Sequence, residues 1–257
     1  MFTEVDLSQQ VAVVTGAGAG FGLAFCRTLA EHGATVIIAE INEAAGKRAE
    51  QMLTNEGLKA KFMLCDASNP DHMQNVARQT ADAFGRLDIW VNNAGLSQNA
   101  PSELVTPAEW QRLIGVMLSG TFYGSQAAGQ IMLKQGKGNI INIASINGVV
   151  AQAGRASYSA AKAGIIRLTE VLASEWGPHN IRANAIAPAV IMTDLVRGNL
   201  ANGSANMDVY TNRSPMRRLG EIPELITALL FLVSTDSAYI TGQTLRVDGA
   251  WASDHYL

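Results

Sequence analysis

Short runs of apolar and β-branched residues recur along the chain, and longer amphipathic stretches separate them. The runs lie at 11–15, 35–40, 60–65, 87–92, 138–145, 180–187 and 244–248. Each run is nearly continuous in apolar residues, as expected for strands buried on both faces of a sheet. Stretches of helical length and periodicity lie between them at 42–56, 71–84, 107–135 and 158–175. This alternation predicts a parallel sheet with helices on both sides.

The length and composition favour one folded domain. A chain of 257 residues, of which 48% are hydrophobic and 16% charged, can bury a large core. No linker and no repeat of fixed period interrupts the alternation. We therefore expect a single α/β domain over 1–257, with a doubly wound parallel sheet of about seven strands. The segment 190–215, rich in Asn, Gly, Ser and Met at 197–214, is predicted to be a flexible substrate loop at the edge of the sheet.

The charge balance favours a small-molecule ligand. The formal net charge is −3 and lysines and arginines form no run, which argues against nucleic acid or an anionic membrane as main partner. The first ten residues contain two acids and no apolar signal core, and the apolar run at 226–233 is too short to cross a bilayer. We expect a cytoplasmic protein with no nucleic-acid or membrane partner.

The cysteines and histidines show no metal-binding pattern. Cys26 and Cys65 belong to no CxxC or Cys/His cluster, so we expect them to pack as small hydrophobic residues in a reducing compartment. The four histidines are scattered, without HExxH spacing, at positions 32, 72, 179 and 255. No metal site is predicted.

A glycine-rich turn follows the first predicted strand. The sequence TGAGAGFG at 15–22 lacks a strict GxGxxG but contains T-G-x-x-x-G-x-G, with Gly16, Gly20 and Gly22 in register. Glycines here let the backbone approach a pyrophosphate, whose charge is favoured at the N-terminus of the next helix. A turn that binds nothing is the alternative. The position between a strand and a helix favours dinucleotide binding.

Glu40 ends the second predicted strand, about twenty residues after the glycine turn. A carboxylate there can accept both hydroxyl groups of an adenosine ribose and would repel a 2′-phosphate. Neither Ala17 in the turn nor Ile41 after the strand could receive the extra phosphate of NADP. The position predicts NAD as cofactor. The alternative is an exposed carboxylate at a strand end.

The chain resembles the short-chain dehydrogenase/reductase family over nearly its whole length. The resemblance rests on four motifs in the family's order, which are Thr15-Gly16-x-x-x-Gly20-x-Gly22, Asn92-Asn93-Ala94-Gly95, Ser145 and Tyr158-x-x-x-Lys162. It implies a Rossmann-like fold, a nicotinamide cofactor and hydride transfer. The resemblance implies a set of cofactor-binding residues that includes the glycine turn and Glu40. They are Gly16, Gly18, Gly20, Phe21, Gly22, Glu40, Ile41, Asp66, Ala67, Asn93, Ala94, Gly95, Tyr158, Lys162, Pro188, Ile191 and Thr193. Ala189 replaces a glycine of the family's P-G-x-x-x-T segment.

The resemblance implies Ser145, Tyr158 and Lys162 as the catalytic residues. A hydride can leave a carbinol carbon only if the hydroxyl proton is removed as well, and a phenolate can serve as the base. Free tyrosine has a pKa of about 10, so bringing it toward neutrality takes about three units, or about 4 kcal/mol. Lys162, one helical turn away, and the positive nicotinamide ring can supply that field. Ser145 would hold the substrate oxygen.

Met117 departs from the family pattern. The family usually has an asparagine here, which helps to kink the helix and orders a water that links the lysine to solvent, whereas this chain has V-M-L-S-G at 116–120. Three interpretations follow, which are proton relay through the Met117 carbonyl and a water, relay through another polar group, or weakened turnover. We favour the first, because the other three catalytic positions are retained.

The predicted function is that of an NAD-dependent alcohol dehydrogenase or carbonyl reductase acting on a secondary alcohol/ketone pair, such as a polyol, a sugar or a hydroxy acid. The alternatives are a cofactor-retaining dehydratase or epimerase, and an NAD-binding sensor without turnover. Arg155, Arg197 or Arg213 could meet an anionic substrate, although solvation or pairing with acids is the favoured explanation for them. The resemblance also implies a homotetramer, formed through the helices at 107–135 and 158–175, with the C-terminal 250–257 in reach of a neighbouring subunit.

Overall fold

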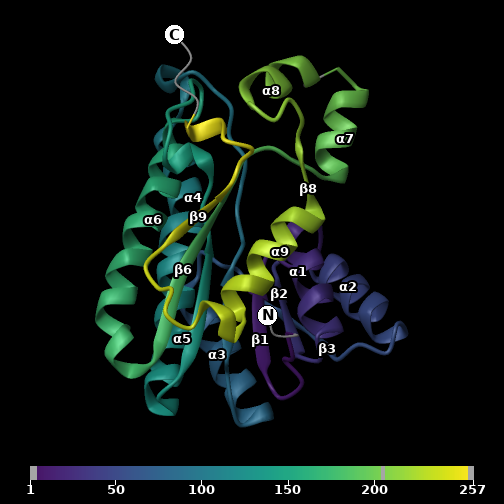
Figure 1. Ribbon diagram of the computed structural model, residues 1–257, viewed down its shortest axis with the longest axis vertical. Coiled ribbons are helices and arrows are strands. Elements are labelled where there is room, and N and C mark those ends of the chain that lie inside the picture. Colours follow the sequence, from purple (N-terminus) through teal and green to yellow (C-terminus); the bar gives the residue numbers. More distant parts are fainter. Residues whose placement is uncertain (1–4, 204–205, 254–257) are drawn as a thin grey trace.

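The computed structural model of the protein describes residues 5–203 and 206–253. Within these residues a parallel sheet has the order β3-β2-β1-β4-β5-β6-β9 (Figure 1). Its strands are β1 (Val11–Thr15), β2 (Thr35–Glu40), β3 (Ala60–Leu64), β4 (Ile89–Asn92), β5 (Gly138–Ile143), β6 (Ile181–Pro188) and β9 (Thr244–Val247). The predicted doubly wound sheet of seven strands is confirmed. The order reverses between β1 and β4, where such sheets bind ligands.

Helices cover both faces of the sheet, and each face has its own apolar core. One core contains side chains of α1 (Gly20–Glu31), α2 (Glu43–Asn55) and α9 (Ile222–Val233), and the other those of α3 (Pro70–Phe84), α5 (Gly120–Gln135) and α6 (Ala156–Trp176). Helices α3 and α4 (Pro107–Ile114) each begin with a proline, whose fixed φ suits the first helical position. Short 3₁₀ turns lie at Ser102–Leu104, Ile146–Gly148, Gly177–His179, Thr235–Ser237 and Trp251–Ser253.

The edge strands differ from the prediction that every strand is buried on both faces. In β3 only Met63 is buried, and β9 contains no buried residue. Each of these strands has a neighbour on one side only, so one edge and part of its faces meet solvent. Apolar runs thus predicted the strands correctly but overestimated their burial at the two ends of the sheet.

The stretch predicted as a flexible loop contains regular structure. It forms β7 (Ile191–Met192), which pairs with β8 (Gly220–Glu221), and the short helices α7 (Asp194–Ala201) and α8 (Met207–Arg213). Thr193 and Asn206 cap these helices, each by accepting a backbone amide with its side chain. The composition of this segment did not predict these helices, because Asn, Gly and Ser also favour turns.

The predicted helix at 107–135 is interrupted by a wider turn. Residues Gly115–Ser119 form a π-helical segment between α4 and α5, and Met117 lies at its centre. Such segments are rare and occur frequently at functional sites. The helix is distorted although the family's asparagine is absent, so the side-chain amide is not needed for the distortion.

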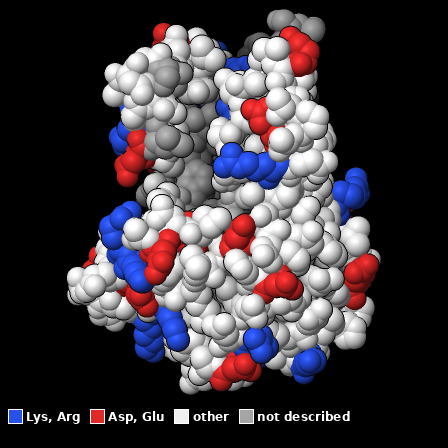
Figure 2. Space-filling view, turned by 180° about the vertical axis from the view of Figure 1, so that it is seen from behind, with Lys and Arg blue, Asp and Glu red and all other residues white. Residues whose placement is uncertain are grey.

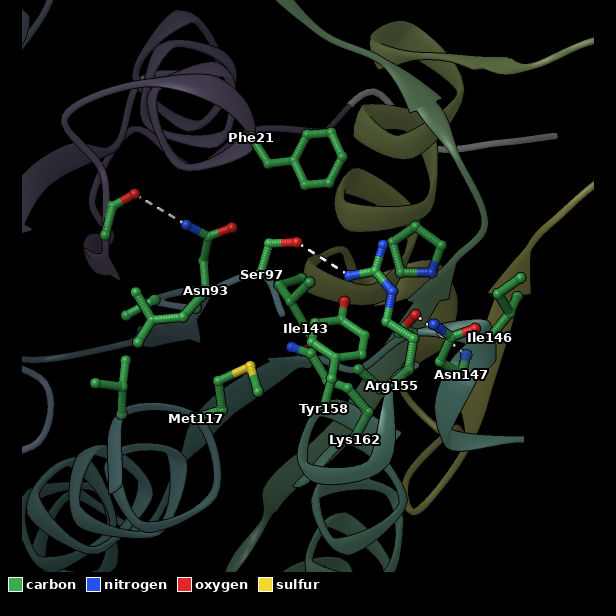
Figure 3. A pocket seen from close by; sticks show the side chains of 18 of the residues that line it. Phe21, Asn93, Ser97, Met117, Ile143, Ile146, Asn147, Arg155, Tyr158 and Lys162 are labelled. Atoms are coloured by element: carbon green, nitrogen blue, oxygen red, sulfur yellow. Dashed lines mark hydrogen bonds between the residues drawn. The ribbon is translucent and has the colours of Figure 1, made fainter. Parts of the chain in front are cut away.

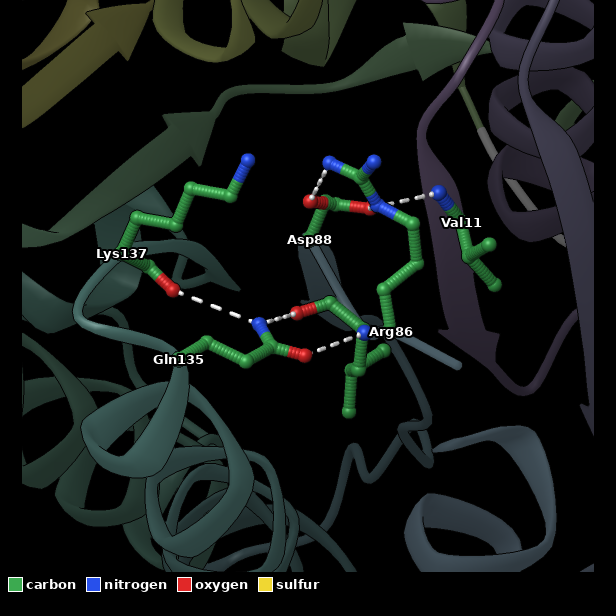
Figure 4. Close-up of polar contacts among 6 residues, drawn as sticks. Val11, Arg86, Asp88, Gln135 and Lys137 are labelled. Atoms are coloured by element: carbon green, nitrogen blue, oxygen red, sulfur yellow. Dashed lines mark hydrogen bonds and ion pairs between the residues drawn. The ribbon is translucent and has the colours of Figure 1, made fainter. Parts of the chain in front are cut away.

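A buried carboxylate connects two strands at their amino ends, opposite the carboxyl ends that carry the motifs. Asp88 precedes β4, accepts the amide of Val11 at the start of β1 (2.9 Å) and binds Nε and Nη2 of Arg86 (both 2.7 Å) (Figure 4). The side chain of Gln135, at the end of α5, donates to the Leu87 carbonyl and accepts the Leu87 amide (both 2.8 Å). Together these contacts join the start of β1, the segment before β4 and the end of α5.

No helix among the described residues is both long and apolar enough to span a membrane. Acidic and basic side chains are interspersed over the face that Figure 2 shows, without a large patch of one sign.

Candidate active site

A cavity of about 840 Å³ opens at the carboxyl ends of the strands. Its walls come from the segments that follow β1, β2, β3, β4, β5 and β6, and from α4, the π-helical segment, α6, α7 and α8. Its size lies within the range of ligand pockets, which hold about 300–1,000 Å³. The reversal of strand order between β1 and β4 therefore coincides with a cavity.

The glycine turn is shaped for a close approach of backbone to ligand. Gly16 has a φ of 62°, and a Cβ on Gly22 would lie 2.4 Å from the Gly16 carbonyl oxygen. At Gly20, with a φ of 56°, a Cβ would meet nothing within 4 Å. Helix α1 begins there with no acidic residue in its first turn and no side-chain cap. Its free amides can hold an anion such as a pyrophosphate.

Asn93 and Thr15 hold the glycine turn in place. Asn93 Nδ2 donates to the carbonyls of Thr15 (2.9 Å) and Gly16 (3.0 Å) (Figure 3). The Thr15 hydroxyl accepts the amides of Asn93 (3.0 Å) and Ala94 (3.1 Å). The first glycine motif and the N-N-A-G motif thus form one unit.

Glu40 faces the glycine turn from the end of β2. Its carboxylate accepts the amides of Gly18 (3.0 Å) and Asn42 (2.9 Å), and its side chain lines the cavity. A carboxylate has about four lone-pair positions, so acceptor capacity remains for a ligand. Asp66, after β3, also lines the cavity and is held by the hydroxyl and amide of Ser68 (2.7 and 2.8 Å).

Ser145 lies just after β5 and faces Tyr158. Its hydroxyl accepts the amide of Asn147 (3.2 Å), so its proton can be donated to the Tyr158 oxygen or to a ligand. Close packing brings it to α6, because a Cβ on Gly148 would lie 2.7 Å from the Lys162 carbonyl. The glycine therefore allows the 3₁₀ turn to approach the helix that carries Tyr158.

Two opposing effects act on the pKa of the buried Tyr158 phenol. Burial raises its pKa above the ordinary value of 10, while a hydrogen bond with Ser145 and the positive charge of Arg155 oppose the rise. The guanidinium carbon of Arg155 lies 5.7 Å from the centre of the phenol ring. Arg155 had not been predicted to assist Tyr158, although it precedes it by three residues.

Lys162 is the most buried cation of the cavity. Its ammonium donates to the Ile143 carbonyl (2.6 Å) and lies 5.7 Å from the centre of the Tyr158 ring. Burial lowers its pKa from 10.5 to about 8. The predicted stacking of the two side chains one turn apart is observed (Figure 3).

Met117 fills the position of the missing asparagine with an apolar side chain. It is fully buried, and its cluster with Leu113 and Ala161 packs against Tyr158. Its carbonyl accepts the hydroxyl of Thr121 (2.6 Å) and the amide of Gly120. Both acceptor positions are therefore occupied, which weakens the favoured interpretation of a water relay through this carbonyl.

Most of the predicted site residues meet at this cavity. Those that line it are Gly16, Phe21, Glu40, Ile41, Asp66, Ala67, Asn93, Ala94, Gly95, Ser145, Tyr158, Lys162 and Pro188. Gly18, Gly20 and Gly22 belong to the turn without lining the cavity. Ile191 is buried in β7, and Thr193 caps α7 by accepting the Val196 amide (3.3 Å), so neither side chain reaches the cavity.

Several lining residues were not predicted. Ser97 follows the N-N-A-G motif, Tyr210 comes from α8, and Trp251 lines the cavity of its own chain rather than only reaching toward a neighbour. Residues 254–257, the rest of the predicted C-terminal extension, lie outside the described residues. Arg155 and Arg213, named from the sequence as candidates for an anionic substrate, also line the cavity, whereas Arg197 does not line it. The other contacts depend on long-range packing.

Comparison with known proteins agrees with this geometry. A family model described as enoyl-(acyl carrier protein) reductase matches residues 16–251. The chain belongs to the short-chain dehydrogenase/reductase family. Members of this family are oxidoreductases that bind a nicotinamide cofactor and a small-molecule substrate. The resemblance inferred from the motifs is confirmed.

Three relatives illustrate the range of substrates in this family. The chain is 39% identical over 247 residues to a 3-oxoacyl-(acyl-carrier-protein) reductase FabG of Chlamydia muridarum, covering 96% of this chain and 98% of the relative. It is 36% identical over 246 residues to a D-threitol dehydrogenase of Mycolicibacterium smegmatis, covering 95% and 94%. The solved structure of a gluconate 5-dehydrogenase of Burkholderia cenocepacia in complex with NADP and tartrate has a TM-score of 0.92 at 33% identity, covering 98% of both chains.

Proposed function

We propose that this member of the short-chain dehydrogenase/reductase family transfers a hydride between NAD and a secondary alcohol/ketone pair. One observation supports the proposal above all. Ser145, Tyr158 and Lys162 line the same cavity as Glu40 and the glycine turn. This chemistry describes an alcohol dehydrogenase or carbonyl reductase. When bound, the nicotinamide supplies the hydride acceptor or donor.

Tyr158 acts as the general acid/base in this proposal. In oxidation its oxygen takes the hydroxyl proton of the alcohol, and in reduction it returns the proton to the ketone oxygen. The Ser145 hydroxyl, whose proton is not used in its bond with Asn147, orients the substrate oxygen toward Tyr158. The charges of Lys162 and Arg155, each 5.7 Å from the ring centre, favour the phenolate.

Glu40 supports NAD rather than NADP as the cofactor. Its carboxylate is held at the glycine turn by two backbone amides and lines the cavity, where it would repel a 2′-phosphate. The neighbouring Ile41 is 61% exposed and offers no positive charge. A related gluconate dehydrogenase binds NADP, so cofactor choice varies among these proteins.

Replacing Glu40 by glutamine should lower the ratio of kcat/KM with NAD to kcat/KM with NADP by about 10- to 100-fold, because the negative charge is lost while the side-chain shape is kept. Steady-state kinetics with both cofactors measure the ratio. Glu43→Gln is the matched control, since Glu43 is exposed and pairs with Lys47. An unchanged ratio in Glu40→Gln would exclude this carboxylate as the selective group.

The activity itself is tested by nicotinamide absorbance at equal NAD and NADP concentrations. The substrates are neutral polyols, simple secondary alcohols and hydroxy acids. Reduction of NAD by at least one class is expected. NADH binding without turnover of any substrate would favour the sensor alternative, and conversion without net change in the nicotinamide would favour a dehydratase or epimerase.

We propose a homotetramer as the assembly. Apolar side chains are exposed on the helices where the family resemblance implies subunit contacts, namely Trp110, Phe122, Leu133 and Val171. Exposed apolar patches of this kind mark protein interfaces. Helix α6 carries one of these side chains and also Tyr158, so assembly and catalysis would share an element.

Sedimentation equilibrium should give the mass of four chains, because tetramers are a common closed assembly. Phe122→Glu should shift the protein toward smaller species by introducing a charge into the apolar surface. Met52→Glu, on α2, changes a similarly exposed apolar side chain away from these helices and serves as control. A wild-type protein that sediments as a monomer would refute the tetramer.

Three further proposals concern the organisation and location of the protein. We infer that 1–257 function as one cofactor-binding domain and that 190–215 act as its substrate loop, since Val196, Tyr210 and Arg213 of this segment line the cavity. A cytoplasmic location is supported by Cys26 and Cys65, which are both buried free thiols.

A further inference from the structure

The charged side chains around the cavity are unevenly distributed. The carboxylates among its described lining residues are Glu40 and Asp66, which follow β2 and β3. Two cations, Arg155 and Lys162, flank the ring of Tyr158, each 5.7 Å from its centre. The surroundings of the reacting group are therefore positive, with no carboxylate among the lining residues there to balance them.

Arg155 is only partly satisfied by its protein contacts. Nη1 donates to the hydroxyl of Ser97 (3.0 Å) and to the carbonyl of Gln98 (2.6 Å). Nε is buried and has no hydrogen-bond partner, and no bond to another described residue uses Nη2. Because protein atoms enclose Nε, Nη2 is the group left for a charge-assisted hydrogen bond to an anion in the cavity.

Carboxylates of described residues neutralise several arginines of this protein, but not Arg155. Ion pairs within the described residues involve Arg27, Arg86, Arg167, Arg197 and Arg218. Arg155 has no such carboxylate partner in that part of the chain. It is the N-cap residue of the 21-residue α6, whose first turn contains no acidic residue. The positive end of the helix adds to the charge of the guanidinium.

We propose that Arg155 is the residue that binds an anionic group of the substrate, so that the preferred substrates are hydroxy acids with a carboxylate near the carbinol carbon. Figure 3 shows the guanidinium of Arg155 on the same side of the cavity as the Tyr158 hydroxyl. The guanidinium carbon lies 5.7 Å from the centre of the Tyr158 ring, so an anion bound there would lie beside the residue that handles the carbinol proton. The proposal rests on the proposed function, because it assigns the substrate class of the same site.

A purely structural role for Arg155 would be fulfilled by Nη1 alone. Its two bonds connect the start of α6 to residues 97 and 98, and the hydroxyl of Ser157 also donates to the side chain of Gln98. These bonds position the guanidinium but do not neutralise its charge. A half-buried, unneutralised cation is costly, and an anionic ligand removes that cost.

Matched substrates separate anion recognition from catalysis. Threitol and threonate share a four-carbon skeleton and differ in one carboxylate, as do glucitol and gluconate on six carbons. The measured quantity is the ratio of kcat/KM for the acid to kcat/KM for the neutral polyol. Effects of a substitution on Tyr158 or on the fold act on both compounds and cancel in this ratio.

Arg155→Met should lower the acid-to-polyol ratio by about 10- to 100-fold, the range expected for a charge-assisted hydrogen bond. Arg155→Lys should recover part of the loss, because it keeps the charge without the fork. Arg197→Met, at an exposed arginine paired with Glu221, should leave the ratio unchanged. A ratio that is insensitive to Arg155→Met would overturn the proposal. An equal loss in Arg112→Met or Arg213→Met would also overturn it, since these two arginines line the cavity and form no ion pair with a described residue.

Calorimetric titration of the NADH-loaded protein with the same four compounds tests the subsite without turnover, because the reduced cofactor cannot accept a hydride from them. Tighter binding of the acids that is lost in Arg155→Met would support the subsite even if no compound is oxidised, in which case only the proposed function fails. Oxidation of the neutral polyols with no preference for the acids would preserve the proposed function and overturn the subsite. Equal affinity for acids and polyols would also overturn it.

Discussion

Replacing Tyr158 by phenylalanine is expected to lower kcat/KM by about 1,000-fold, within the range that a positioned general acid/base contributes. The substitution removes the phenolic oxygen and keeps the ring that packs against the Met117 cluster. Among the described residues that line the cavity, Tyr158 is the phenol that has two cations beside its ring. Loss of the proton acceptor should therefore stop turnover without disturbing the cavity.

Cofactor affinity distinguishes this chemical effect from a binding defect. NADH titrations of Tyr158→Phe should give a dissociation constant within about threefold of the wild type, since the substitution acts on the chemical step. Tyr123→Phe removes a phenolic oxygen from a tyrosine that packs in the core outside the cavity, and it should keep wild-type kinetics. Substantial turnover by Tyr158→Phe would refute the assignment of Tyr158 as acid/base.

Replacing Lys162 by methionine is expected to abolish turnover and, at the same time, to stabilise the fold by about 2 kcal/mol at pH 7. The charged form of Lys162 is disfavoured by burial, which lowers its pKa from 10.5 to about 8. The loss of the hydrogen bond to the Ile143 carbonyl offsets part of the gain, at about 1 kcal/mol. Urea unfolding of both proteins measures the difference in free energy.

The stabilisation by Lys162→Met should depend on pH in a defined direction. Below pH 8 both the folded and the unfolded wild type carry the charge, so the penalty of burying it is fully present. Between pH 8 and pH 10.5 the folded protein binds fewer protons than the unfolded one, so the wild type gains stability as pH rises. The advantage of the variant should therefore shrink from pH 7 to pH 9.5. Lys134→Met, at an exposed position on α5, is the control and should show no such trend.

An advantage of Lys162→Met that is constant over this pH range would mean that the ammonium is not the source of the cost. A large destabilisation at pH 7 would mean that its bond to Ile143 outweighs the burial of its charge.

The sequence predicts the sheet well because its signals are local. Each central strand has a continuous apolar run, and Pro70 and Pro107 mark the starts of two helices. The exposure of β3 and β9 could not be predicted, since it depends on which strands end the sheet. The helices α7 and α8 were missed because the side chains of Thr193 and Asn206 that cap them also favour turns.

The candidate site was predicted where a motif fixes both residue type and spacing. Tyr158 and Lys162 lie on one helix, so their separation follows from helical geometry. The contacts of Arg155 with Ser97 and of Trp251 with the cavity join residues far apart in sequence, and no periodicity reports such distances. The side chain of Thr193 was expected at the cofactor, but a motif match did not show that its hydroxyl is used to cap α7.

The hydrogen bonds between Thr15 and Asn93 determine how much of the chain must fold before the glycine turn takes its final shape. The bonds that shape the glycine turn join residues 77 to 79 positions apart. A growing chain that ends before Asn93 already contains the whole glycine turn and Glu40, yet lacks the amide group that holds the turn. Such non-local contacts form only after the intervening loop has closed. The shape of the glycine turn that binds a dinucleotide is therefore complete only after β4 has docked beside β1.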